Sequence, residues 1–454
     1  MDHKRGSFSG KIGFVLSAAG ASVGLGNIWR FPYLAAKYGG AIFLLVYIIL
    51  AMTFGYTMII AETSIGRMTG KSPVGAYKSF SDKPALRVGG WINAIIPILI
   101  VPYYSVIGGW VIKYLVEYFR GNAKLLAEDG YFTDFISNGV STELCFVAFC
   151  AFTLIIIFAG VQNGIERVSK IMMPILIVLS VIIAVYSVTR PGALAGVKYF
   201  LVPNVKNFSW MTVVSAMGQM FYSLSIAMGI LITFGSYMKK DTAIEDSTRN
   251  VEVFDTGIAI MAGLMIIPAV FAFSGGDPDT LQAGPSLMFI TIPKVFQNMG
   301  FGTVIGIVFF LLVLFAAVTS SIALTESAVS TFEDELGWGR KKATVLVGVI
   351  MLVLGSLSSL GYGPLAGIKI IGMQFLDLFD FLTNSVMMPI AALLTSLLVS
   401  RVVGIDKIEE EIIHGESAFR RKKVFVVMIK YLCPVFAIII LLSSVANALG
   451  WIKM

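Results

Sequence analysis

Charged residues are scarce in this chain. Asp, Glu, Lys and Arg make up only 13% of its 454 residues, about half the share found in soluble globular proteins. Apolar residues make up 57% and gather in blocks of about 20, long enough to cross a hydrocarbon core of about 30 Å as helices. This composition excludes a soluble enzyme and a nucleic-acid binder. It also excludes a β-barrel, whose strands alternate over about ten residues, so we predict an all-α membrane protein.

Cysteine and histidine are rarer still, with three and two residues. Cys145, Cys150 and Cys433 lie in apolar stretches, so we expect them to pack as small side chains and not to form a disulfide or a metal site. His3 and His414 lie in polar segments without metal-ligand spacing. No nucleophile–base pair and no phosphate loop preceded by a strand is present either, so no enzymatic activity is predicted.

Eleven apolar segments are long enough to be spanning helices. A further segment, 275–301, is too polar and too often interrupted by glycine and proline to span. We expect it to form an extracellular lid of short helices, with an amphipathic part at 287–296. The predicted spans run at about 11–36, 41–66, 88–119, 142–160, 164–188, 209–238, 246–273, 302–333, 342–360, 370–400 and 425–449.

Basic residues predict the orientation, because the cytoplasmic loops of membrane proteins carry an excess of Lys and Arg. The chain has 34 Lys and Arg against 27 Asp and Glu, a net charge of +7. With the N-terminus in the cytoplasm, 23 of these 34 basic residues fall on the inner side, 10 on the outer side and Arg30 within the membrane. An odd number of spans then places the C-terminus, Trp451–Met454, outside.

Two of the predicted helices carry residues that interrupt a helix at mid-membrane. The first has Gly20, Gly24 and Gly26 followed by Asn27 and Arg30, and the sixth has several glycines among serines and a glutamine. Glycines alone would also suit a small-residue packing face between helices. An amide and a guanidinium at the same depth favour a functional break, since buried polar groups in a membrane are costly.

The interrupted helices occupy corresponding positions in two halves of five helices. This spacing indicates an inverted-repeat transporter with its site at the midplane, where unwound carbonyls suit a cation and helix N-termini suit a carboxylate. The predicted organisation is a cytoplasmic N-terminal latch at 1–10, a first repeat at 11–188, an extracellular loop at 189–208, a second repeat at 209–400 that includes the lid at 275–301, a cytoplasmic loop at 401–424, and a last helix with an extracellular C-terminus at 425–454.

The run Ser22–Pro32 resembles the helix 1 signature of the neurotransmitter:sodium symporter family, whose fold is the LeuT type. The similarity extends to 62–66, 103–104, 164–174, 218–225, 319–321 and 333–336, and the short loops resemble bacterial members. The resemblance implies sodium-coupled symport of neutral hydrophobic amino acids, aromatic and branched-chain, by alternating access. It implies this substrate and the lipid bilayer as partners, with no nucleic acid and no obligate protein partner, in a bacterial inner (plasma) membrane.

The family's functional positions imply two sodium sites, made of the oxygen ligands that an alkali cation prefers. Considered alone, the hydroxyls of the second site could equally bond back to carbonyls of their own helix. The first site would use the Ser22 carbonyl, Asn27, Ser223 and Asp255 with the substrate carboxylate, and the second would use the carbonyls of Gly20, Val23 and Ala316 and the hydroxyls of Thr319 and Ser320.

Asp255 departs from the pattern of many family members, which carry asparagine there and need chloride nearby. A carboxylate at the first sodium site supplies a negative charge that chloride otherwise provides. We therefore predict transport that does not require chloride, with Asp255 ionised when sodium is bound. The alternative is that Asp255 is a structural ion-pair partner.

The substrate pocket implied by the resemblance is small and apolar, without a second acidic group. The α-carboxylate of the substrate would bind to the helix 1 break and the Tyr104 hydroxyl, and its ammonium group would bind to the helix 6 break. Met228 occupies a position where phenylalanine is common; because methionine is flexible and polarizable, we predict room for Trp, Tyr and Phe as well as Leu, unless Met228 is plain packing. The implied substrate residues are Ser22, Val23, Gly24, Leu25, Gly26, Ile100, Tyr104, Tyr222, Ser223, Ser225, Met228, Ser321 and Leu324.

Alternating access also implies two gates. Arg30 and Asp380 match the family's extracellular ion pair. Gly164 and Pro174 match a helix 5 pair associated with unwinding, for which a static kink is the alternative. Glu62 is expected to hydrogen-bond to the helix 1 break. The implied intracellular gate comprises Arg5, Phe8, Tyr237 and Asp334, although a terminal basic residue is also an ordinary orientation signal.

Two other functions remain open on the sequence. A sodium-independent amino-acid exchanger would keep the fold, but the second sodium site looks complete. A membrane amino-acid sensor that does not transport would usually carry a further signalling domain, and only about 20 residues separate the last two helices.

Overall fold

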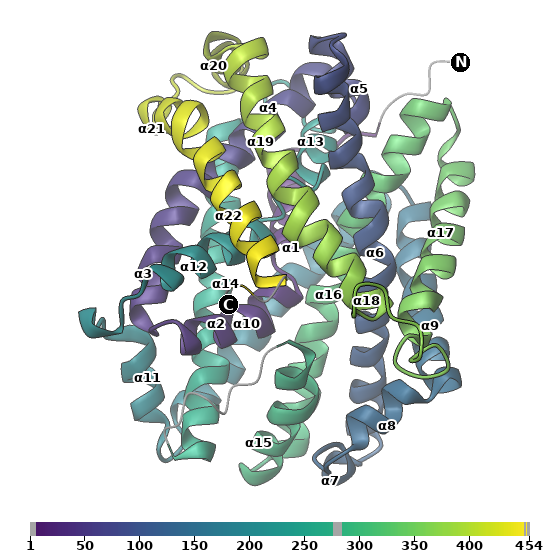
Figure 1. The fold of residues 1–454 in the computed structure, drawn as a ribbon, viewed down its shortest axis with the longest axis vertical. Coiled ribbons are helices and arrows are strands. Elements are labelled where there is room, and N and C mark those ends of the chain that lie inside the picture. Colours follow the sequence, from purple (N-terminus) through teal and green to yellow (C-terminus); the bar gives the residue numbers. More distant parts are fainter. Residues whose placement is uncertain (1–5, 276–283, 449–450, 452–454) are drawn as a thin grey trace.

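The computed structural model describes residues 6–275, 284–448 and 451. Within these residues the chain is helical, apart from loops and an isolated antiparallel bridge between Ile370 and Met373. Many of the long helices run along one direction, vertical in Figure 1, and short helices lie at both ends. The predicted all-α class is confirmed.

Nine helices of the described residues are long and apolar enough to span a membrane, and one bent pair makes a tenth span. A second pair, separated by residues 224–229, supplies the eleventh span that the sequence predicts. In chain order the spans are α1 (Lys11–Ser22) with α2 (Phe31–Lys37), α3 (Ala41–Leu50) with α4 (Tyr56–Thr69), α6 (Pro84–Phe119), α9 (Gly139–Phe158), α10 (Arg167–Val188), α12 (Trp210–Ser223) with α13 (Ile230–Gly235), α14 (Ile244–Ser274), α16 (Gly302–Leu336), α17 (Arg340–Leu360), α18 (Phe375–Asp380) with α19 (Met388–Leu398), and α21 (Lys422–Val427) with α22 (Cys433–Ala448).

Short helices occupy the connections. The predicted extracellular lid forms a π-helical turn at Leu287–Thr291 followed by α15; its residues 276–283 lie outside the described residues. α5 and α20, which the sequence analysis did not predict, lie toward the top of Figure 1, and α7, α8 and α15 lie toward the bottom. The short helices are α5 (Pro73–Phe80), α7 (Ala123–Leu126), α8 (Tyr131–Ser137), α11 (Ala193–Leu201), α15 (Ile292–Asn298) and α20 (Ile405–Ile413).

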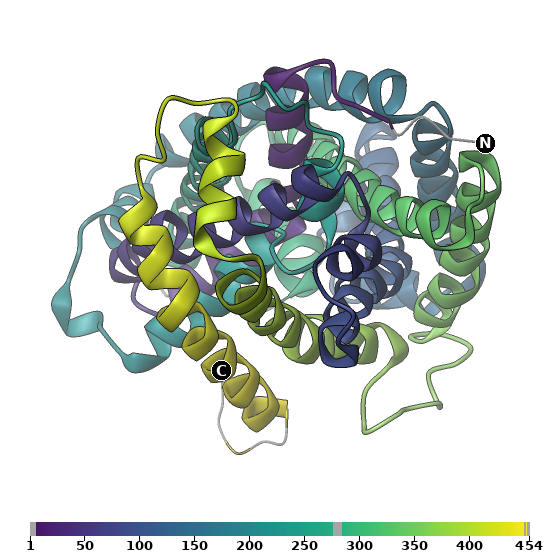
Figure 2. The same cartoon turned by 90° about the horizontal axis from the view of Figure 1, so that it is seen from above.

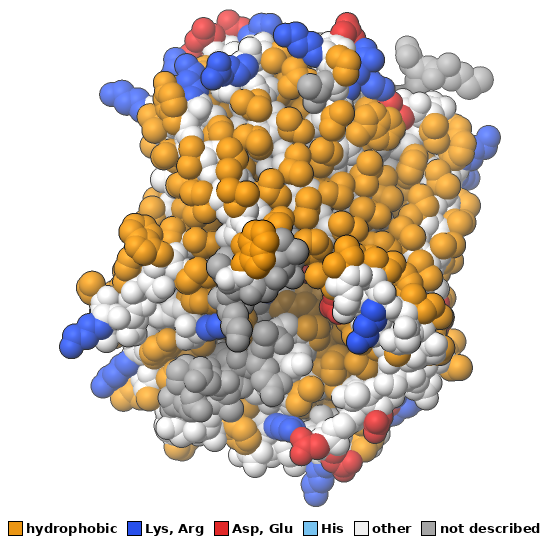
Figure 3. Space-filling model, in the orientation of Figure 1, with side chains coloured by type: hydrophobic (Ala, Val, Ile, Leu, Met, Phe, Trp, Pro, Cys, Tyr) orange, Lys and Arg blue, Asp and Glu red, His pale blue; other side chains and the backbone are white. Residues whose placement is uncertain are grey.

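The surface has the distribution expected of a membrane protein. Hydrophobic side chains form a broad band across the middle of the face shown in Figure 3, and Lys and Arg gather at the end of this face that carries α20 and α21. α22 lies at the edge of the bundle in Figure 2. Of the most apolar stretch of its span, Lys422–Asn447, 33% is buried, against 78% for the span that α6 forms. The inner helices therefore meet protein, and the outer ones present apolar faces to lipid.

The first span is broken in its middle. Its axis bends by 53° between α1 and the π-helical turn Gly26–Arg30. A Cβ on Gly24 would lie 2.7 Å from Ser320 Oγ, and one on Gly26 would collide with the ring of Tyr222. These two glycines are required because other side chains approach the backbone so closely.

The sixth span is broken between α12 and α13. Ser225, Ala227 and Gly229 have φ angles of 51°, 58° and 70°, in the left-handed region that side chains rarely adopt. Such a conformation persists only where its surroundings hold it. The Ala227 N–H donates to Glu62 Oε1 at 2.7 Å. Glu62 therefore braces the helix 6 break, which corrects the expectation that it binds helix 1.

Candidate functional site

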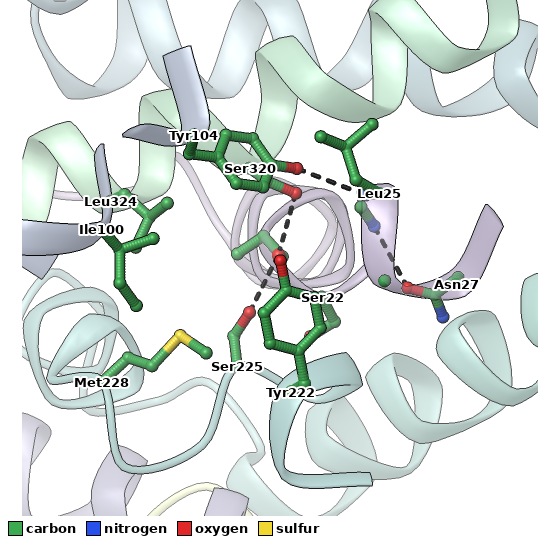
Figure 4. Close-up of a pocket in the computed structure, with 13 residues that line it drawn as sticks. Ser22, Leu25, Asn27, Ile100, Tyr104, Tyr222, Ser225, Met228, Ser320 and Leu324 are labelled. Carbon is green, nitrogen blue, oxygen red and sulfur yellow. Dashed lines mark hydrogen bonds between the residues drawn. The ribbon is translucent and has the colours of Figure 1, made fainter. Parts of the chain in front are cut away.

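The two helix breaks meet around a small cavity in the middle of the bundle, of about 30 Å³ (Figure 4). Side chains from α6 and α16 close the space between them. The residues that line it are Ala21, Ser22, Gly24, Leu25, Gly26, Asn27, Ile100, Tyr104, Tyr222, Ser225, Met228, Ser320 and Leu324. Ten of the thirteen substrate residues implied by the resemblance are among them, so the structure brings together segments from four spans.

The helix 1 side of the cavity presents hydrogen-bond donors. The Leu25 N–H donates to the Tyr104 hydroxyl at 3.3 Å, and the Gly24 N–H donates to Asn27 Oδ1 at 3.2 Å. Both N–H groups lie at the start of the helical segment after the break, where the helix dipole favours an anion. This side of the cavity can bind a carboxylate.

The helix 6 side presents oxygen atoms and an apolar wall. Ser225 Oγ donates to the Ala21 carbonyl at 2.9 Å and joins the two breaks. Ile100, Met228 and Leu324 lie together on one side of the cavity in Figure 4. Hydroxyl and carbonyl oxygens can accept hydrogen bonds from an ammonium group, and the wall can contact an apolar side chain.

Three residues expected in the substrate pocket do not line this cavity. The Ser321 hydroxyl is hydrogen-bonded to Thr153 Oγ1 of α9 at 3.2 Å. Successive residues of a helix point about 100° apart, so Ser320 and Leu324 of α16 face the cavity while Ser321 faces its neighbour. Val23 and Ser223, the other two, have buried side chains outside the lining.

Three of the four residues implied for the first sodium site, Asn27, Ser223 and Asp255, form one hydrogen-bonded cluster around the fully buried Asp255. The hydroxyl of the fourth, Ser22, instead donates to the carbonyls of Ala18 and Leu224 at 3.1 and 3.3 Å. Asn27 Nδ2 donates to Asp255 Oδ1 at 2.8 Å and to Ser223 Oγ at 2.9 Å. Ser223 Oγ lies 2.9 Å from the same carboxylate oxygen. Asp255 forms no ion pair with any described residue, which argues against its role as a structural ion-pair partner.

The sequence analysis missed Tyr47, which completes this cluster. Its hydroxyl, carried by α3, donates to Asp255 Oδ2 at 2.7 Å and lies 2.9 Å from Ser223 Oγ. Gln219 was also not assigned; its Nε2 donates to the Gly26 carbonyl at 3.0 Å. Tyr47 lies in an apolar span, where a tyrosine is not unusual. The only signal in the sequence was that its hydroxyl is an isolated polar group among apolar residues, which favours a position that faces the protein interior.

The second cluster contains only neutral oxygens. Ser320 Oγ lies 3.2 Å from the Gly20 carbonyl and 3.4 Å from the Val23 carbonyl. Thr319 Oγ1 lies 3.2 Å from the Ala316 carbonyl of its own helix. All five residues implied for the second sodium site thus gather where the end of α1 meets α16. Thr319 does bond back to its own helix, but Ser320 reaches across to helix 1.

The two residues of the implied extracellular gate do not form an ion pair in this structure. Arg30 and Asp380 line one cavity, which shares Tyr222 with the substrate cavity, and no ion pair joins them within 4.0 Å. The Arg30 guanidinium instead lies 5.3 Å from the ring centre of Tyr222. Asp380 accepts a hydrogen bond from the Tyr103 hydroxyl at 3.2 Å.

The N-terminal segment packs against Tyr237, a residue of the implied intracellular gate. The Phe8 ring packs edge-on against Tyr237, with ring centres 6.1 Å apart, and the Phe8 N–H donates to the Tyr237 carbonyl at 3.0 Å. Asp334 accepts from the Ser72 N–H at 2.6 Å. Arg5 lies outside the described residues.

A buried pair that the sequence analysis missed lies beside these contacts. Arg340, at the start of α17, donates through NH1 to Glu326 of α16 at 3.0 Å, and the Tyr237 hydroxyl donates to Glu326 at 2.7 Å. The carboxylate of Glu326 is fully buried. Two donors compensate its charge and tie three spans together.

An irregular segment precedes the regular part of helix 5. Gly160 has a φ of 88°, and a π-helical turn at Val161–Glu166 precedes α10. A Cβ on Gly164 would collide with the Ile156 carbonyl. Pro174 lies within the regular part of α10, so the irregular backbone is at Gly164 and not at the proline.

Two interrupted spans that meet around a mid-bundle cavity, beside two oxygen-lined clusters, are the architecture of a secondary membrane transporter. Residues 5–128 and 133–451 match the family described as "Sodium:neurotransmitter symporter family". The chain belongs to this family, whose members are sodium-coupled transporters and not enzymes.

Individual relatives support this assignment over nearly the whole chain. The "Uncharacterized sodium-dependent transporter YhdH" of Bacillus subtilis is 34% identical over 98% of both chains. The human "Sodium- and chloride-dependent GABA transporter 2" is 26% identical over 90% of this chain and 75% of its own. The crystal structure of MhsT in complex with L-phenylalanine matches with a TM-score of 0.87 and 34% identity, over 97% of this chain and 100% of that chain.

Proposed function

We propose that this protein imports neutral hydrophobic amino acids, aromatic ones included, together with sodium across a bacterial plasma membrane. The observation that carries the proposal is the polarity of the cavity: N–H donors and Tyr104 on one side, hydroxyl and carbonyl oxygens on the other, and an apolar wall beside them. An amino acid has a carboxylate, an ammonium and a side chain in that arrangement.

The apolar wall narrows the substrate class. None of the described residues that line the cavity is Asp, Glu, Lys or Arg, so a second charge on the substrate would lack a partner. Met228 lies in this wall with only 4% of its surface exposed, and an unbranched thioether can change rotamer to admit a ring. The similarity to MhsT, whose structure holds L-phenylalanine, supports aromatic substrates.

We infer two sodium sites, one at the Asp255 cluster and one at the Ser320 cluster. At 100 mV, each ion that moves inward contributes about 2.3 kcal/mol from the potential and about 1.4 kcal/mol from a tenfold gradient. Two ions therefore supply roughly 7 kcal/mol, enough for about 10⁵-fold accumulation, whereas one supports a few hundredfold. Because Asp255 supplies a negative charge, chloride is not required.

The test is uptake of tryptophan and leucine into proteoliposomes with an inward sodium gradient, repeated with potassium in place of sodium and gluconate in place of chloride. Sodium-dependent uptake of both amino acids, unchanged in gluconate, is expected. Leucine uptake alone would refute the enlarged pocket. Uptake that ignores sodium would instead indicate an exchanger, and binding without uptake would indicate a sensor.

A further inference from the structure

A third cavity, which shares no lining residue with the two described above, lies on the outer face of the bundle. It is a groove of about 530 Å³ between the start of α9 and the end of α17, at the end of the molecule that carries α7 and α8 (Figure 1). Its lining residues are Asn138, Gly139, Val140, Glu143, Leu144, Val147, Leu360 and Pro364. α9 packs against α17 on one side, and only 39% of its most apolar stretch is buried.

The walls of this groove suit a hydrocarbon chain. Val140 and Leu144 are 74% and 68% exposed, one turn apart on the outer face of α9, and Val147 continues the same row. Leu360 and Pro364 form the facing wall. A solvent-exposed row of this kind on a spanning helix is where an acyl chain of the bilayer packs.

One residue does not fit a purely apolar groove. Glu143 Oε1 accepts a hydrogen bond from the Ser356 hydroxyl of α17, whereas Glu143 Oε2 is buried and has no hydrogen-bond partner among the described residues. No described cation pairs with this carboxylate. A carboxylate oxygen without a partner beside lipid is costly, so a cationic ligand would stabilise it.

The position of Glu143 indicates where such a cation would come from. It lies one helical turn inside the start of α9, about 6 Å along the helix axis from Gly139, within reach of the polar head groups of the bilayer. Asn138, at the N-cap, uses its side-chain oxygen for the Ser141 N–H at 3.0 Å. Its amide N–H₂ and the positive end of the helix therefore remain for a phosphate.

We propose that the groove binds a phospholipid with a primary ammonium head group, an ethanolamine phospholipid of the outer leaflet. The ammonium donates to Glu143 Oε2, the phosphate lies against Asn138, and one acyl chain follows Val140, Leu144 and Val147. A primary ammonium has three N–H donors, whereas a trimethylammonium has none, so the site discriminates ethanolamine from choline lipids. This proposal does not depend on the transported substrate.

The experiment measures lipid retained on the purified full-length protein by native mass spectrometry, after reconstitution with equal amounts of ethanolamine, choline and glycerol phospholipids of the same chains. We expect one ethanolamine lipid to remain bound to the wild-type protein. The Glu143→Gln variant should retain at least tenfold less of this lipid. Glu128→Gln, an exposed glutamate at the same end, is the matched control and should retain the lipid.

A second pair of variants tests the acyl-chain wall. Leu144→Trp fills the groove and should release the lipid, whereas Leu442→Trp, 64% exposed on α22, should not. A single symmetric peak in size-exclusion chromatography and an unchanged helical circular-dichroism spectrum report that each variant is folded. Equal retention of ethanolamine lipid by wild type and Glu143→Gln would overturn the proposal, as would equal retention of choline and ethanolamine lipids by the wild type.

Discussion

The two candidate sodium clusters lie against the same helix break but are built from different chemistry. The first contains the carboxylate of Asp255, held by donors from Asn27 and Tyr47. The second contains hydroxyl and carbonyl oxygens without a formal charge, drawn together by Ser320. A buried carboxylate is tolerated only where donors or cations compensate it. The first cluster therefore depends on charge, and the second on the geometry of helix 1 against α16.

Removing the charge from the first cluster should have the largest effect. Asp255→Asn keeps the size of the side chain but loses its attraction for a cation in a low-dielectric site. We expect sodium-driven uptake in gluconate to fall about 100-fold, a change of about 3 kcal/mol, and to recover partly when chloride is supplied. Asp129→Asn, an exposed aspartate, is the control. Normal uptake by Asp255→Asn in gluconate would contradict the charge-based interpretation.

Removing one hydroxyl from the second cluster should weaken sodium binding less. Ser320→Ala loses one oxygen ligand and the contacts that gather the helix 1 carbonyls, worth about 1–1.5 kcal/mol. We expect the sodium concentration for half-maximal tryptophan binding to rise about tenfold. Ser321→Ala removes the neighbouring hydroxyl, which faces Thr153. This variant should change the half-maximal sodium concentration by less than about twofold. Equal effects of the two variants would mean that Ser320 does not serve the ion.

A change in the apolar wall should leave both clusters intact. Met228→Phe replaces a flexible side chain in the wall of the cavity with a rigid ring. The affinity for tryptophan should therefore fall by about 1 kcal/mol, roughly fivefold. The affinity for leucine and the sodium dependence should stay the same. Met52→Phe, on a half-exposed methionine of the second span, controls for the substitution itself. Unchanged competition between tryptophan and leucine would show that Met228 does not limit substrate size.

The smallest effect is expected at a carboxylate outside both clusters. Glu62→Gln keeps the oxygen that accepts the Ala227 N–H, so sodium affinity should change less than about threefold by equilibrium binding. Glu62→Ala removes the acceptor and should reduce tryptophan binding more strongly, because the left-handed backbone of the helix 6 break loses its brace. A tenfold loss of sodium affinity in Glu62→Gln would show that charge matters beyond the Asp255 cluster.

The spans and the two breaks follow from local patterns in the sequence. A block of apolar residues predicts a helix wherever it lies, and glycines beside Asn27 and Arg30 indicate an interruption before any tertiary contact is known. α5 and α20 were missed because short helices at a membrane surface carry only one or two turns of pattern. The directions of Glu62, Ser321 and Tyr47 were missed for another reason, since each depends on which helix packs beside it.

The sequence by itself determined that this chain spans a membrane, how many times, and where two of its helices break. Those properties depend on the transfer of apolar residues into lipid and on backbone conformations that glycine allows. Only the tertiary structure decided that Tyr47 donates to Asp255, that Glu62 holds helix 6, and that Glu143 lies in an outer groove with one oxygen unpaired. These contacts join residues distant in the chain, and the packing of whole helices sets which of them meet.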